Sequence, residues 1–149
     1  MTLGEKLFEE NGNVTGFKVT KVHPLEGVTM EVSFTSEIKG VGKFPSGKNL
    51  GSGTVTQYPH GIVDGSYQGS FMTTTEAGGN SGGGSADQFV WWAHEKTKAV
   101  EGGKFKGLTM MTGFTNSKKL SWMNNLIIAL DLETNPESQT FRAIAYEWK

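Results

Sequence analysis

The chain has 149 residues, enough for one domain around one core, and its apolar fraction of 36% and charged fraction of 19% are typical of folded chains. Its 14 basic and 15 acidic residues leave a formal charge of -1, with Arg142 as the one arginine. Phosphate and base contacts need clustered Lys and Arg, so we expect no nucleic-acid partner. The absence of cysteine excludes disulfides, thiolate nucleophiles and Cys-ligated zinc.

The first 12 residues lack the apolar stretch of a secretion signal, and no apolar run approaches the ~18 residues of a membrane helix. These features predict a cytoplasmic protein without a membrane span. Residues 1–12 are expected to form an N-terminal arm or a short helix, because Leu3, Leu7 and Phe8 fall on one side of a helix. Residues 13–149 are expected to form one β domain.

From residue 13 onward the side chains alternate with a period of two, which is typical of strands. Residues 28–38 are the clearest case, with Val28, Met30 and Val32 on one face and Thr29, Glu31 and Ser33 on the other. The pattern predicts eight strands, at residues 14–23, 28–38, 54–58, 62–74, 87–97, 104–115, 120–133 and 140–148. Residues 40–53 are expected to be a loop or a bent crossing, and residues 76–86 a Gly/Ser-rich loop.

Eight similar strands in hairpin order predict an all-β fold, a closed antiparallel eight-stranded barrel, with a β-sandwich as the alternative. Of the 21 glycines, Gly65 and Gly69 interrupt the predicted strand at residues 62–74. Such glycines mark bulges or a close approach to the backbone, which a small curved barrel needs.

Three segments support a resemblance to known proteins: GSGTVTQ at residues 51–57, GSYQGSF at residues 65–71, and KLSWMNNLIIALDLE at residues 119–133 with the closing YEWK. They resemble small uncharacterised bacterial and archaeal proteins whose fold is similar to the allene-oxide-cyclase type of eight-stranded barrel, a calycin-like relative of the lipocalins. The resemblance covers about two thirds of the chain. It implies the barrel, a lumen for an apolar molecule, and oligomers, but no particular reaction and no catalytic residues.

His94 and Glu95 are the candidate catalytic residues, as a general base and as an acid with a raised pKa. Neighbours on a strand point to opposite faces, so only one of the two is expected to face the lumen. A structural histidine and a solvated glutamate are the alternative interpretation.

The candidate ligand-binding residues are aromatic or polar side chains of the predicted strands, namely Tyr67, Trp91, Trp122, Asn124, Arg142 and Tyr146. Aromatic walls with a few polar groups are typical of small-molecule pockets, although the same rings could be ordinary core. Asn124 lies in an apolar strand, and Arg142 could bind a ligand carboxylate or pair with a glutamate such as Glu133.

His23, His60 and His94 lie on separate segments without metal-ligand spacing, and no phosphate-binding motif is present, so we expect no metal and no cofactor. Three functions remain open. The first is a barrel that binds a small hydrophobic molecule, and the second is a cofactor-free isomerase or cyclase acting on an apolar substrate. The third is a structural homodimer or homotrimer that associates through outward-facing Met123, Ile127 and Ala129.

Overall fold

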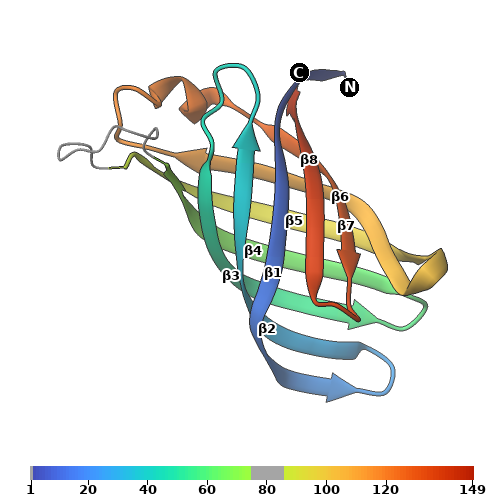
Figure 1. Ribbon diagram of the computed structural model, residues 1–149. Helices are drawn as coiled ribbons and strands as arrows, with labels where there is room; N and C mark the ends of the chain where they lie inside the picture. The colour runs from blue at the N-terminus through green and yellow to red at the C-terminus, as the bar shows by residue number, and fades with distance from the viewer. Residues whose placement is uncertain (1, 75–85) are drawn as a thin grey trace.

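A computed structural model describes residues 2–74 and 86–149, and it is an all-β barrel (Figure 1). The elements in chain order are β1 (Leu3–His23), β2 (Gly27–Gly40), β3 (Gly47–Tyr58), β4 (Ile62–Thr73), β5 (Gln88–Val100), η1 (Glu101–Gly103), β6 (Lys104–Phe114), η2 (Ser121–Asn125), β7 (Ile128–Asn135) and β8 (Thr140–Trp148). Each strand pairs antiparallel with the next, and β1 also pairs with β8, which closes the barrel. The predicted barrel is therefore confirmed, and the sandwich is wrong.

Three local predictions differ from the structure. Residues 3–12 are the first half of β1 and not an arm or a short helix, because their backbone pairs with β8 and β2. The predicted loop at residues 40–53 ends early, since β3 begins at Gly47. The predicted strand at residues 120–133 is a 3-10 helix, η2, followed by the shorter strand β7. The Gly/Ser-rich segment falls almost wholly in residues 75–85, outside the described residues.

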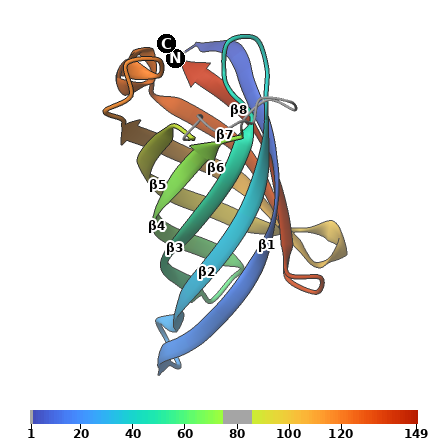
Figure 2. The ribbon, with the colours of Figure 1, turned by 60° about the vertical axis from the view of Figure 1, so that its left-hand side comes forward.

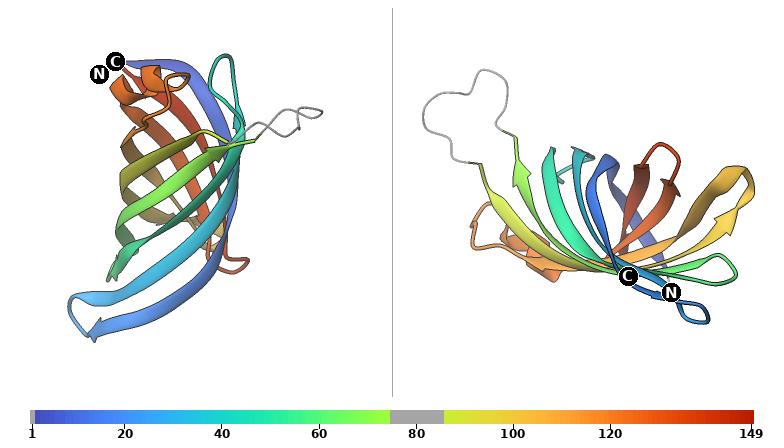
Figure 3. Two further views of the ribbon diagram at one scale, coloured as in Figure 1. Left: turned by 90° about the vertical axis from the view of Figure 1, so that its left-hand side faces the viewer. Right: turned by 90° about the horizontal axis from the view of Figure 1, so that it is seen from below.

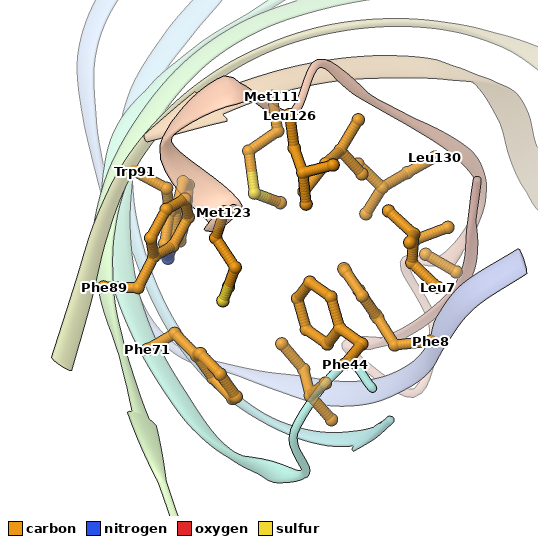
Figure 4. Close-up of a cluster of buried hydrophobic side chains, with 14 of the residues drawn as sticks. Leu7, Phe8, Phe44, Phe71, Phe89, Trp91, Met111, Met123, Leu126 and Leu130 are labelled. Carbon is orange, nitrogen blue, oxygen red and sulfur yellow. The ribbon is translucent and has the colours of Figure 1, made fainter. Parts of the chain in front are cut away.

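Apolar side chains fill one end of the barrel (Figure 4). Phe8, Phe71 and Phe89 point inward from their strands, and Met123 of η2 packs against them with no exposed surface. Phe44, from the β2–β3 connection, stacks at 4.8 Å from Phe8 between ring centroids. The two chain termini lie beside each other at this end (Figure 1).

Inward-facing glycines let aromatic rings lie flat across neighbouring strands. A Cβ on Gly69 would lie 2.3 Å from Cζ2 of Trp91, and a Cβ on Gly51 would lie 2.4 Å from the Phe34 ring. The same relationship between neighbouring strands joins Gly12 to Phe141, Gly53 to Tyr67 and Gly113 to Phe89. The β3–β4 and β4–β5 ladders run without a register shift, so Gly65 and Gly69 mark close approach and not bulges.

The other end of the barrel is formed by the β1–β2, β3–β4, β5–β6 and β7–β8 turns. The β1–β2 hairpin extends beyond the other three turns (Figure 2; Figure 3, left). Bulges between Val14 and Gly16 and between Val19 and Lys21 interrupt the β1–β2 ladder in this hairpin, and bulges increase the bend and twist of a strand.

Candidate functional site

A cavity of about 400 Å³ occupies the part of the lumen nearest the turns. Its walls are mostly apolar and come from all eight strands, with Val32, Val55, Val63, Phe105, Met111, Leu130 and Leu132 among the lining residues. Phe17 and Met30 extend this lining onto the β1–β2 hairpin, where Phe17 is 59% exposed. The volume is within the usual range of ligand pockets, roughly 300 to 1,000 Å³.

Glu10 of β1 is a buried carboxyl group in the cavity wall. Its Oε2 accepts hydrogen bonds from Ser36 Oγ and, at 3.2 Å, from Asn49 Nδ2. Burial raises the pKa of Glu10, and these two hydrogen bonds lower it by less. The first half of β1 thus carries an ionisable group into the lumen.

Trp91 sets the orientation of the Asn49 amide. The indole Nε1 can only donate, and it lies 2.7 Å from Asn49 Oδ1. The Oδ1 atom must therefore face Trp91, which leaves Nδ2 to donate to Glu10. The chain of contacts joins β5, β3 and β1 along the inner wall of the barrel.

Glu95 of β5 is the second buried carboxyl group, with 4% of its surface exposed. Tyr67 donates its hydroxyl to Oε1 at 2.7 Å, and Thr97 Oγ1 donates to Oε2 at 2.9 Å. Burial raises the pKa of Glu95 above its ordinary value, against the opposing effect of these hydrogen bonds. Burial and the adjacent Glu95 carboxyl also raise the pKa of Tyr67, so its phenol is the neutral donor.

Thr109 of β6 lies directly opposite Glu95 in the β5–β6 ladder and lines the same cavity. Its side chain is buried, and Oγ1 finds no hydrogen-bond partner among the described residues. Buried hydroxyl groups in proteins are normally hydrogen-bonded. This hydroxyl is therefore an unused polar group beside the Glu95 carboxyl.

The structure places three of the predicted site residues, Tyr67, Trp91 and Glu95, in the cavity wall. His94 points to the outer face, where Nε2 lies 3.1 Å from Asp64 Oδ1 and Nδ1 lies 3.2 Å from Ser66 Oγ. The period-two rule thus correctly puts His94 and Glu95 on opposite faces. His94 is wrong as a luminal base.

Four predicted ligand contacts lie away from the cavity. Trp122 packs on Phe44 at the filled end, with Lys43 Nζ 4.1 Å from its ring. Asn124 accepts from the backbone N–H of Thr115 at 2.7 Å and donates to its carbonyl at 3.1 Å, so it holds η2 to the end of β6. Neither Trp122 nor Asn124 faces the cavity, because both lie in the 3-10 helix η2 and not in the expected strand.

Arg142 and Tyr146 alternate with the buried Ala143 and Ala145 and therefore point outward from β8. Arg142 lines a second depression, of about 910 Å³, together with exposed side chains such as Asn13 and Lys48, and it is not among the residues that line the lumen cavity. Glu133 is opposite Arg142 in the β7–β8 ladder, but its carboxylate contacts Lys104 at 3.2 Å and Lys106 at 4.0 Å.

The expected outward apolar face at residues 123–129 is also wrong. Met123 and Ala129 are buried, and only Ile127 of the three is exposed. Other exposed large apolar side chains lie on β1, as Val19 and Val22 do, and on β3–β6, where they include Leu50, Met72, Trp92, Leu108 and Phe114.

Sequence reasoning missed Glu10 and Asn49. Phe8, Glu10, Gly12 and Val14 have the same period-two phase as a strand, but the leucines near the N-terminus also fit a helix. Asn49 lies among glycines, and these favoured a loop over the start of β3. The alternation of residues 8–14 could have placed Glu10 on the inner face of a strand. No pattern in the sequence indicated an inward-facing position for Asn49.

Within residues 2–74 and 86–149, no three His, Asp or Glu side chains gather closely enough to hold a metal ion. Over the same ranges, the helices are too short and too polar to cross a membrane.

Solved structures with the same fold are similar to this chain over nearly its whole length. A protein of unknown function from Clostridium acetobutylicum matches with a TM-score of 0.79 and 15% identity over 100% of both chains. A β-barrel-like protein from Acinetobacter baumannii matches with a TM-score of 0.74 and 13% identity over 99% of this chain and 96% of that chain. A protein described as an enzyme from Penicillium herquei matches with a TM-score of 0.62 and 14% identity over 99% of this chain and 97% of that chain. No family model and no curated protein matches the chain.

Proposed function

We propose that this barrel binds one small, mostly apolar molecule in its lumen. The observation that carries the proposal is the cavity of about 400 Å³, whose wall is mostly apolar and carries a few buried polar groups, with further polar side chains near the turns. Such a composition is typical of small-molecule sites, in which apolar contact provides affinity and a few polar groups set orientation. The molecule enters between the β1–β2 hairpin and the other turns, because the opposite end is filled by Phe44, Phe71 and Met123.

A matched pair of variants tests this proposal. Val55 of β3 lines the cavity, whereas the adjacent Thr54 is exposed on the outer face. Val55→Phe adds a ring to the lumen, and Thr54→Phe adds the same ring to the same strand on the other side. The ligand is 1-naphthylmethanol, a neutral fluorescent molecule, and its binding is measured by fluorescence titration and by thermal shift.

The expected result is saturable binding to the wild type and to Thr54→Phe, with at least a tenfold loss for Val55→Phe. Equal binding by the two variants would place the ligand outside the lumen and overturn the proposal. Circular dichroism checks that both variants keep the barrel.

A cofactor-free isomerase or cyclase is the second candidate function. The Glu95 carboxyl faces the cavity beside the neutral phenol of Tyr67, and burial raises the pKa of Glu95 toward the range useful for proton transfer. Turnover of a polyene or epoxide that Glu95→Gln abolishes while binding persists would support catalysis, and turnover unchanged by Glu95→Gln would exclude this role.

A further inference from the structure

The cavity wall carries acidic groups and no basic ones. Glu10 and Glu95 both line it, and no Lys, Arg or His is among its described lining residues. Neither carboxyl forms a salt bridge within the part of the chain that the structure describes. A buried carboxylate is costly without a positive partner, so a ligand could supply the missing charge.

The polar groups around Glu95 leave room for another hydrogen-bond donor. Tyr67 and Thr97 donate one hydrogen bond each to the carboxyl group, and a carboxylate has about four acceptor sites. Thr109 Oγ1, directly opposite and without a partner among the described residues, is a further acceptor that faces the same space. An ammonium group has only donors and matches this set of free acceptors.

Aromatic rings form part of the same wall. Phe34 has its ring centroid 5.7 Å from that of Tyr67, 6.0 Å from that of Trp91 and 5.5 Å from that of Phe141. All four residues line the cavity. The faces of such rings attract cations, and the attraction is stronger where water is excluded.

We propose that the ligand of the lumen is an apolar molecule with a protonated amine, whose ammonium group lies against the Glu95 carboxylate and Thr109 Oγ1. This inference rests on the proposed function and names the class of its ligand. The bound ammonium group keeps Glu95 ionised, which burial alone opposes. A ligand with a carboxylate, such as a fatty acid, is repelled by the two acidic side chains.

Three molecules with one ring system separate charge from shape: 1-naphthylmethylamine, 1-naphthylmethanol and 1-naphthoate. Their dissociation constants are measured at pH 7 by isothermal titration calorimetry with the full chain. For the wild type, we expect the amine to bind at least tenfold more tightly than the alcohol, and the carboxylate to bind more weakly than both.

Glu95→Gln and Thr109→Val test the two acceptors. Glu95→Gln is expected to bring the affinities for the amine and the alcohol within about twofold of each other, with the alcohol still bound. Thr109→Val keeps the shape of the side chain. It is expected to weaken binding of the amine without weakening binding of the alcohol. Glu31→Gln, a change of the same kind on the outer face of β2, is the control and leaves the preference unchanged.

The outcomes separate the inference from the proposed function. If alcohol and amine bind equally well and Val55→Phe blocks both, the lumen is a binding site and the amine inference is overturned. Tightest binding of the carboxylate, or an amine preference that survives Glu95→Gln, also overturns the inference. If none of the three molecules binds in a manner sensitive to Val55→Phe, both proposals fail.

Discussion

The indole ring of Trp91 crosses β4 to donate its N–H to Asn49 of β3, at 2.7 Å from Nε1 to Oδ1. The strand between them offers Gly69, where a Cβ would lie 2.3 Å from Cζ2 of the indole ring. The hydrogen bond therefore depends on glycine at that position. Through Asn49 it also determines which amide atom faces Glu10.

Gly69→Ala is expected to lower the free energy of unfolding by about 1–3 kcal/mol, because the new methyl group collides with Trp91 and with the carbonyl oxygen of Leu50. Gly16→Ala is the control, since a Cβ there approaches only Ser33 Oγ at 3.2 Å. Urea unfolding of both variants checks the difference. A Gly69→Ala variant as stable as Gly16→Ala would contradict the described packing.

Asn49→Asp is expected to destabilise the barrel by about 2 kcal/mol or more at pH 7. The amide nitrogen that donates to Glu10 becomes a carboxylate oxygen, which places two acidic groups within hydrogen-bond distance. Protonation of one of them relieves the repulsion, so the loss should shrink toward pH 4. A loss independent of pH would indicate a steric cause, and Asn49→Gln measures that cause separately.

The free energy of unfolding of the empty wild-type barrel is expected to fall as the pH rises above about 4.5, the ordinary glutamate value. Burial raises the pKa of Glu10 and of Glu95, so between the ordinary and the raised values the folded chain holds more protons than the unfolded chain. The fall ends once the pH exceeds the raised values. Each unit of upward shift corresponds to about 1.4 kcal/mol.

Glu10→Gln and Glu95→Gln should each remove part of this slope, and Glu31→Gln should leave it unchanged. Urea unfolding from pH 4 to pH 8 measures all four proteins. If Glu10→Gln and Glu95→Gln both kept the wild-type dependence of stability on pH, that dependence would not arise from these two carboxyl groups.

His94→Ala is expected to change the free energy of unfolding by less than about 1 kcal/mol, because the His94–Asp64 pair is largely exposed. Ligand binding should not change, since the imidazole points away from the cavity. Thermal unfolding and titration with 1-naphthylmethanol check both statements. A tenfold loss of affinity would place His94 at the site after all.

Met123→Ala is expected to cost about 2–5 kcal/mol, because the Met123 side chain is fully buried at the filled end of the barrel. Ile127→Ala, four residues later and 38% exposed, is the control and should cost less. Chemical denaturation compares the two. Equal losses would argue that η2 does not close this end.

Much of the fold follows from local patterns that a sequence displays. Residues 28–34 alternate between apolar and polar side chains, and they lie in the strand β2. The same alternation correctly separates His94 from Glu95. It fails at residues 120–126, where Leu120, Met123 and Leu126 are buried at a spacing of three, as a 3-10 turn requires.

The sequence by itself determined the strand-rich class, the hairpin order and the opposite directions of neighbouring side chains, because these depend on the period-two geometry of an extended backbone. Only the tertiary structure decided that residues 3–13 pair with β8, and hence that Glu10 and Glu95 face one lumen. The reason is that pairing between the first and last strands is a long-range contact, which no local pattern encodes. The tertiary structure also decided which glycine lies beneath which aromatic ring, because a ring that lies across a neighbouring strand contacts residues that are distant in the sequence.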